Sequence, residues 1–183
     1  MRMYWFLLGV LATVVVILAG GYLWVRLGFV DPRADIPVSA AEARLMGPAM
    51  DASVRRRAPQ VRNPLAANPA TLVQGMQVYQ ADCALCHGDA AHPSARLADA
   101  LYPRPPQFLV DPADMPEAQN YYIVQHGVRM TGMPAWGEVL DQRQIWTVVT
   151  FLSHMAQLPP EVRSQWLMLA AAVTGVGAEP ALR

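Results

Sequence analysis

The sequence predicts an all-α protein with one membrane-spanning helix at its N-terminus. Three observations lead to this class. An uncharged, strongly apolar run occupies residues 4–25, near the start of the chain. Three later segments carry apolar residues at helical spacing between recognisable helix ends. No segment alternates between apolar and polar residues in the manner of a β-strand.

The N-terminal run is long enough to cross a bilayer. At about 1.5 Å per residue, residues 4–25 span roughly 33 Å. An aromatic pair stands at each end, where the membrane interfaces would lie: Tyr4 with Trp5, and Tyr22 with Trp24. A cleaved signal peptide is the alternative, but its apolar core is normally shorter. We therefore expect residues 1–30 to form an uncleaved, single-pass signal-anchor.

Residues 31–67 form a segment rich in proline and arginine, which we expect to be a tether. A helix is expected within residues 39–58, broken around Gly47 and Pro48 because proline lacks the N–H that a helix interior needs. The arginine run at residues 55–57 has two interpretations. It is either a solvated face of the tether, or a contact with anionic lipid headgroups or a partner subunit.

Three further helices are expected after the tether. The first begins with Asn68 as its N-cap and Pro69 at the first helical position. The second, "PEAQNYYIVQHG", ends at Gly127. The third, "DQRQIWTVVTFLSHM", begins with a capping box of Asp141 and Gln144. The apolar stripe of the third helix consists of Ile145, Val148, Val149 and Leu152.

Residues 161–183 form a C-terminal apolar extension. Its apolar part, residues 166–176, is too short to span a bilayer. This part could cover the surface of the preceding domain or present a patch to another protein. The sequence leaves both interpretations open.

The two cysteines of the chain, Cys83 and Cys86, are followed at once by His87. C-x-x-C-H is the pattern of covalent c-type haem attachment. Two thioethers at this spacing reach both vinyl groups of one porphyrin, and the next residue brings an imidazole to the iron. A redox-active disulfide would favour a thioredoxin-like βαβ context, and zinc would need further ligands. We therefore expect one covalently bound haem c.

The second iron ligand is expected in "HGVRMTGMPAWG", which holds two methionines. Met133 lies between Gly132 and Pro134, which allow a tight, non-helical loop. A thioether ligand favours ferrous iron and so raises the reduction potential. Met130 is closer to the preceding helix and is expected to pack against the edge of the ring. We therefore assign Met133 as the ligand opposite His87.

Taken together, "CALCHG", "HGVRMTGMPAWG" and "QIWTVVTFL" resemble a mono-haem class I cytochrome c of the bacterial, membrane-tethered kind. The resemblance covers residues 68–160, which we expect to form the haem domain. It implies a small all-α fold whose N- and C-terminal helices cross. Gly75, Tyr79 and Phe151 match positions on these two helices. The haem-binding residues that the resemblance implies are Cys83, Cys86, His87 and Met133.

Other residues near these motifs have open roles. In the family, a proline carbonyl usually receives the Nδ1–H of the ligand histidine. The candidates here are Pro103, Pro105 and Pro106. Arg104 could pair with a haem propionate or stay exposed to solvent. His126 is expected to complete a helix end, although it could also meet a propionate or replace Met133. Trp136 is expected to pack near the haem, and His92 and His154 to lie on the surface.

The resemblance implies one-electron transfer in a respiratory-type chain, by a carrier rather than an enzyme. Its redox partners would be a quinol–cytochrome c oxidoreductase or a dehydrogenase as donor, and a terminal oxidase or reductase as acceptor. The alternative is a fixed cytochrome c subunit of a larger membrane oxidoreductase. A third class is an enzyme or gas sensor with an open sixth iron position. A di-haem peroxidase is disfavoured because the chain has one attachment motif.

The location of the haem domain follows from its chemistry. Thioether bonds to haem form outside the cytoplasm, so the domain is expected in the bacterial periplasm and the N-terminus in the cytoplasm. Residues 71–160 carry four arginines and eight acidic residues, and the chain has no lysine. A nucleic-acid partner would require a basic surface on this domain, so none is expected.

Overall fold

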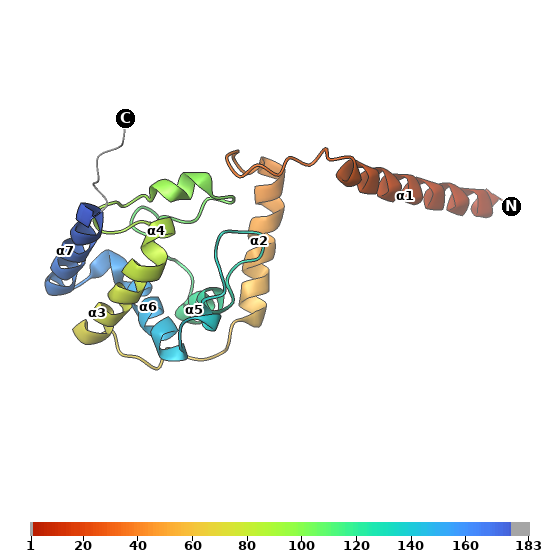
Figure 1. Ribbon diagram of the computed structural model, residues 1–183. Coiled ribbons are helices and arrows are strands. Elements are labelled where there is room, and N and C mark those ends of the chain that lie inside the picture. Colours follow the sequence, from red (N-terminus) through yellow and green to blue (C-terminus); the bar gives the residue numbers. More distant parts are fainter. Residues whose placement is uncertain (1, 177–183) are drawn as a thin grey trace, which may run out of the picture. The chain divides into compact units, whose positions relative to one another are not determined.

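The computed structural model describes residues 2–176 of the chain (Figure 1). These residues form helices and connecting loops, and no β-strand occurs among them. The predicted all-α class is therefore confirmed. The chain divides into two compact units, Met1–Arg33 and Ala34–Arg183.

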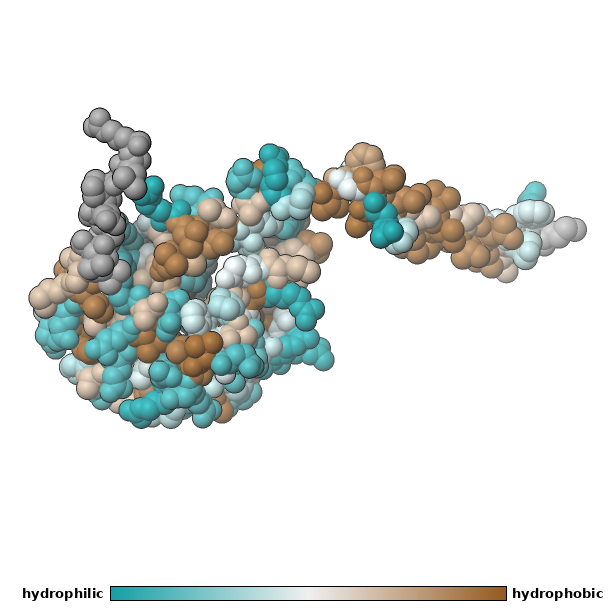
Figure 2. Space-filling view, viewed as in Figure 1, coloured by the Kyte–Doolittle hydropathy of each residue, from teal (hydrophilic) through white to brown (hydrophobic). Residues whose placement is uncertain are grey.

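The first unit consists mainly of helix α1, Arg2–Arg26. It is a single uninterrupted helix with no buried residue. Its visible surface is hydrophobic over most of its length (Figure 2). By length and composition, α1 could cross a membrane.

Helix α2, Ala40–Arg57, belongs to the second unit and runs without interruption through Pro48. The expected break at this proline is therefore wrong. Contacts on both sides of the proline hold the helix together. Near its start, the Tyr102 hydroxyl donates a hydrogen bond to the Glu42 carboxylate. Near its end, Val54 is buried in the domain. These contacts offset the one hydrogen bond that proline removes.

Three consecutive helical segments lead into the cysteine motif: α3, Pro69–Val78; the π-helix η1, Tyr79–Cys83; and α4, Ala84–His87. The Asn68 side chain accepts a hydrogen bond from the Thr71 amide at 3.0 Å, which confirms the predicted N-cap. A π-helical turn within an α-helix often marks a functional site. Here it ends at Cys83, the first cysteine of the motif.

The next two helices end and begin as predicted. Helix α5, Glu117–His126, is followed by Gly127, whose φ of 63° lies in the left-handed region. Helix α6, Gln142–His154, starts with the complete capping box of Asp141 and Gln144. Three short 3₁₀ helices lie in the connections: η2, Arg96–Ala100; η3, Trp136–Glu138; and η4, Met155–Gln157.

The middle of helix α6 is buried on all sides rather than along one stripe. Residues 145–152 are all buried. On one side α6 crosses α3 at Gly75 (Figure 1). A Cβ atom added to Gly75 would lie 2.1 Å from the Thr147 carbonyl oxygen and 2.8 Å from the Phe151 Cβ. The expected crossing of the N- and C-terminal helices of the domain is therefore present, and it requires a glycine at this position.

Helix α7, Pro160–Val176, packs on the domain through one face. The buried residues on this face are Val162, Trp166 and Ala170. The Trp166 ring meets Tyr79 at 5.9 Å and Phe151 at 5.1 Å, both edge to face. This part of the extension therefore covers the domain's own surface. Leu167 and Met168, by contrast, are exposed.

Candidate haem-binding site

The cysteine motif lies at the end of the long helical segment. Both Cys83 and Cys86 are half-buried and unpaired. Burial, with smaller contributions from Asp82 and Cys86, raises the pKa of the Cys83 thiol to about 12. Among the described residues, no three His, Cys, Asp or Glu side chains gather as a metal cluster.

His87 is held by contacts on two sides. Its Nδ1 lies 2.8 Å from the Pro106 carbonyl oxygen, so Pro106 is the proline partner among the three candidates. The Phe108 ring stacks on the imidazole, with centroids 4.7 Å apart and an interplanar angle of 13°. Burial lowers the pKa of His87, and the Pro106 hydrogen bond partly opposes this. A neutral imidazole that donates from Nδ1 leaves the Nε2 lone pair available to a metal.

Gln107 connects the cysteine motif with the proline segment. Its side chain is buried, and its Nε2 donates to the Cys86 carbonyl at 3.0 Å and to the Pro105 carbonyl at 2.8 Å. Its Oε1 accepts a hydrogen bond from the Ala95 amide at 2.7 Å. One amide group therefore ties together three separate points of the backbone around the motif.

The methionine loop is closed by its own hydrogen bonds. The Val128 amide donates to the Met133 carbonyl at 3.2 Å. The Thr131 hydroxyl donates to the Val128 carbonyl at 2.7 Å and accepts from the Met133 amide at 3.1 Å. A Cβ atom on Gly127 would lie 2.6 Å from the Pro134 carbonyl oxygen, so the start and end of the loop touch. The hydrogen bonds of Met133 in this loop are therefore made by its backbone groups.

The two methionines of this loop differ sharply in burial. Met133 is half-buried and packs against the hydrophobic core. Met130 is 88% exposed and has a φ of 60°, which is unusual for a bulky residue and marks a tight turn. The expected packing of Met130 against the ring edge remains a prediction.

Residues 101–107 link the histidine side of the site to the methionine loop. A Cβ atom on Gly132 would lie 3.0 Å from the Leu101 Cδ2, so Leu101 touches the methionine loop. Pro106, near the other end of this segment, accepts the hydrogen bond from His87. Residues 101–107 therefore contact His87 through Pro106 and the methionine loop through Leu101.

The turn after His87 is fixed by a buried carboxylate. Asp89 accepts hydrogen bonds from the Ala91 amide at 2.9 Å and the His92 amide at 2.7 Å. Its other oxygen accepts from Gln80 Nε2 at 3.2 Å. The Gln80 Oε1 in turn accepts from the Trp166 indole at 2.8 Å. This chain of contacts connects α7 with the turn that follows the histidine.

The side chain of Tyr79 also holds the turn that follows His87. Its hydroxyl donates to the Gly88 carbonyl at 2.8 Å, and burial raises the pKa of the phenol, which therefore stays a donor.

Tyr79→Phe should lower the free energy of unfolding by about 1.5 kcal/mol, because a carbonyl in a buried turn loses its partner. Chemical denaturation monitored by circular dichroism measures this change. Tyr122→Phe is the matched control, since that hydroxyl has no hydrogen-bond partner among the described residues. Equal losses in the two variants would contradict the supporting role of Tyr79.

Arg104 is engaged within the protein. Its Nε lies 2.8 Å from the Asp99 carboxylate, and its guanidinium also donates to the Ser94 hydroxyl at 2.9 Å. The side chain is exposed, as one of the two interpretations expected. Its pairing with a haem propionate remains a prediction.

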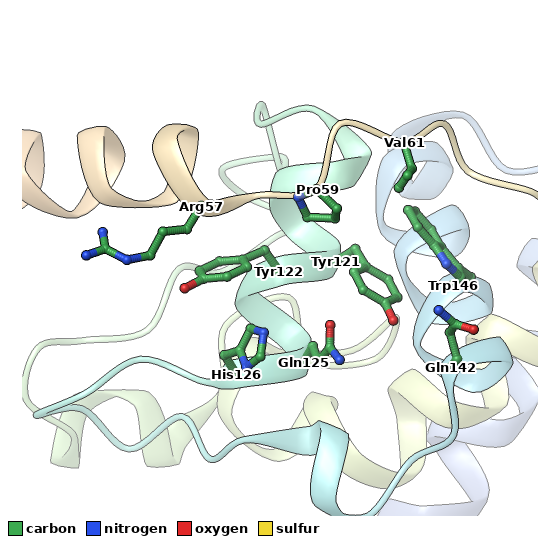
Figure 3. A pocket seen from close by; sticks show the side chains of 9 residues that line it. All are labelled: Arg57, Pro59, Val61, Tyr121, Tyr122, Gln125, His126, Gln142 and Trp146. Carbon is green, nitrogen blue, oxygen red and sulfur yellow. The ribbon is translucent and has the colours of Figure 1, made fainter.

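His126 faces a surface pocket of about 350 Å³ that contains none of the four predicted haem-binding residues (Figure 3). The pocket is lined by Arg57, Pro59, Val61, Tyr121, Tyr122, Gln125, His126, Gln142 and Trp146. His126 is the last residue of α5, and its ring lies 4.7 Å from the ring of Tyr122. The interpretation of His126 as an imidazole at a helix end is therefore the one that the structure favours.

The remaining aromatic and histidine positions broadly follow expectation. Trp136 is half-buried and packs against the core. His92 is exposed beside Asp89. His154 is half-buried rather than fully on the surface, and its Nδ1 lies 2.8 Å from the Thr150 carbonyl oxygen.

Sequence reasoning missed several residues that shape the site. They are Gln80, Asp89, Gln107, Phe108 and Trp166. One local signal existed for Gln107: it is an uncharged polar residue between a run of prolines and the apolar "FLV". A local signal also existed for Asp89, since an aspartate after a glycine often accepts hydrogen bonds from the amides two and three residues on. Gln80, Phe108 and Trp166 make contacts between separate segments, which no local pattern reveals.

The side chains of the site fit a haem group. Two unpaired thiols and a neutral imidazole lie on one helical segment. A thioether with no competing polar role lies in the methionine loop. Thiols, imidazole and thioether are the groups that attach a c-type haem and ligate its iron.

Comparison with known proteins finds a matching family and similarity to solved structures. Residues 70–152 match the family described as "Cytochrome C oxidase, cbb3-type, subunit III". No curated protein matches the chain. The chain is similar to a chain of a reducing HAO-like protein complex from Kuenenia stuttgartiensis, with 22% identity and a TM-score of 0.40. This similarity covers 56% of the present chain and 49% of that chain, about half the length of the relative.

Proposed function

From the c-type cytochrome domain that residues 70–152 form, we propose that this chain transfers single electrons through one covalently bound haem c. In this proposal, Cys83 and Cys86 attach the haem, and His87 and Met133 ligate the iron. The observation that carries the proposal is the Nδ1 hydrogen bond from His87 to the Pro106 carbonyl. It leaves the opposite ring nitrogen of a motif histidine ready for a metal.

The protein's contribution is to hold the ligands still. When bound, haem c supplies an iron that alternates between the ferric and ferrous states and so accepts and releases one electron. Pro106 fixes the tautomer of His87, and Phe108 fixes the plane of its ring. The closed loop from Val128 to Met133 keeps the thioether in one place. Rigid ligands keep the structural change between the two oxidation states small.

The chain is proposed to act at the periplasmic face of a bacterial cytoplasmic membrane. Residues 1–30 would anchor it, with the N-terminus in the cytoplasm, and residues 68–160 would hold the haem. The orientation follows from haem attachment, which takes place outside the cytoplasm. An anchor raises the effective concentration of the domain near other membrane complexes. Such complexes would supply and accept the electron, as a quinol-oxidising complex or dehydrogenase and a terminal oxidase do.

A fixed subunit of a larger membrane oxidoreductase is the second candidate. One specific observation favours it: α7 exposes Leu167 and Met168, two large apolar side chains. The helices on either side of the domain core give this candidate less support. The length of α2 and α7 needs no partner to explain it, because both helices pack on the domain itself.

Haem staining tests the attachment directly. After denaturing electrophoresis, the full chain should carry haem-dependent peroxidase stain near 20.1 kDa. A variant with both Cys83→Ser and Cys86→Ser should lose the stain while the polypeptide remains. Stain that survives in the double variant, or none in the unaltered chain, would refute covalent haem.

Two further measurements separate the classes of function. The reduced chain should not bind carbon monoxide without denaturant if both axial ligands are retained, whereas binding would indicate an enzyme or a gas sensor.

Native electrophoresis of gently solubilised membranes separates carrier from subunit. A haem-stained band near the mass of the chain plus detergent indicates a carrier, and a much heavier band with other redox chains indicates a subunit.

A further inference from the structure

Gln107 has a buried side chain whose hydrogen bonds all go to the backbone around the haem motif. It is 4% exposed and follows Pro106 directly in the chain. We infer that Gln107 is a positioning residue that sets the hydrogen bond between His87 and Pro106. The inference rests on the proposed function, because it concerns the environment of the axial histidine.

Gln107 donates two hydrogen bonds, each to the residue that directly precedes one partner of the His87–Pro106 hydrogen bond. Cys86, whose carbonyl accepts from Nε2 at 3.0 Å, is the residue before His87. Pro105, whose carbonyl accepts from the same nitrogen at 2.8 Å, is the residue before Pro106. One amide nitrogen therefore holds together the two backbone positions from which the His87–Pro106 pair extends.

The orientation of the amide is determined by its third contact. The Ala95 amide donates to Oε1 at 2.7 Å. With the amide turned over, its NH₂ group would face the Ala95 N–H, and its oxygen would face two carbonyl oxygens. A donor at this nitrogen and an acceptor at this oxygen are both required, which glutamine supplies at this length and neither methionine nor glutamate does.

Removal of the amide has a predictable consequence for His87. The carbonyls of Cys86 and Pro105 would lose their shared donor and would draw water into the segment. The proline segment could then move away from the motif, and the 2.8 Å contact from His87 Nδ1 to the Pro106 oxygen would lengthen. A weaker hydrogen bond lowers the basicity of an imidazole ligand. Ferric iron would lose more stabilisation than ferrous iron, so the reduction potential should rise.

The test measures how fast the proton in the hydrogen bond between His87 and Pro106 exchanges with solvent. In the reduced full chain in detergent, NMR measures the exchange of the His87 Nδ1 proton with deuterated solvent. Gln107→Met keeps the length of the side chain and removes its polar atoms. We expect exchange at least about tenfold faster than in the unaltered chain, together with a higher reduction potential. Exchange within about twofold of the unaltered chain would overturn the inference.

Asn120→Leu is the matched control. Asn120 is another buried amide, on α5, and it donates to the Met115 carbonyl at 3.0 Å. Its removal should destabilise the domain to a similar extent but leave the exchange of the His87 proton unchanged. If Asn120→Leu accelerates that exchange as much as Gln107→Met does, the effect is general loosening and Gln107 is not a positioning residue.

A measurement on the unaltered chain covers the case in which Gln107→Met does not fold. If one opening event exposes both groups, the Gln107 Nε2 protons and the His87 Nδ1 proton should have similar protection factors, each being the exchange rate of the free group divided by the measured rate. A protection factor for the Gln107 protons more than about tenfold below that of His87 would overturn the inference. Failure of the proposed function gives a different result, since the unaltered chain would then lack covalent haem in the staining experiment.

Discussion

Gly75→Ala should destabilise the haem domain by about 3 kcal/mol, at the upper end of the usual cost of overpacking. The added methyl carbon would lie 2.1 Å from the Thr147 carbonyl oxygen and 2.7 Å from the carbonyl carbon. Both atoms belong to the backbone of α6, which cannot rotate aside as a flexible side chain would. The two crossing helices must therefore separate, and the packing of Phe151 beside the glycine is lost with them.

Urea denaturation of the full chain, followed by far-ultraviolet circular dichroism, measures this effect. Gly47→Ala is the matched control because nothing lies within 4 Å of a Cβ atom added at Gly47 in helix α2. That variant should stay within about 1 kcal/mol of the unaltered chain, since alanine is the better helix former. Similar stabilities for the two variants would contradict the close crossing at Gly75.

Met133→Ala should abolish the weak far-red absorption band of sulfur-ligated ferric haem. It should also lower the reduction potential by at least about 60 mV, one tenfold change in the equilibrium constant of a one-electron couple. Both effects follow from loss of a soft ligand that favours ferrous iron. The loop itself should survive, because it is closed by backbone groups and by the Thr131 hydroxyl rather than by the methionine side chain.

Met130→Ala is the control for this ligand assignment. Met130 lies in the same loop but is 88% exposed. Its replacement should leave the band in place and the potential nearly unchanged. Optical spectra and redox titration of both variants measure the two effects. Loss of the band in Met130→Ala, with its retention in Met133→Ala, would reverse the assignment of the ligand.

Helix ends were predictable because their signals are local. Asn68, Asp141 and Gly127 act on backbone groups within a few residues of themselves, and all three have the predicted roles. The crossing of α3 and α6 was also foreseen, but only through resemblance to a known family. The sequence around Gly75 does not by itself say which backbone approaches it.

Features that depend on distant partners were not predictable from local sequence. Helix α2 continues through Pro48 because contacts from outside the helix hold it on both sides. The choice of Pro106 among three nearby prolines depends on where the chain meets His87. The role of Gln107 depends on two carbonyls and one amide from separate parts of the backbone. In each case tertiary contacts decide between alternatives that local propensity leaves equal.

The three-ring cluster of Tyr79, Phe151 and Trp166 has a consequence for how such a domain can be inherited. The stretch that matches other cytochromes, residues 70–152, contains the first two rings but not the third. A gene fusion that transferred only this stretch would expose to solvent the faces of Tyr79 on η1 and Phe151 on α6 that Trp166 covers. A fusion partner that joins this stretch after residue 152 would therefore need to bring an apolar side chain of its own to the place that Trp166 fills.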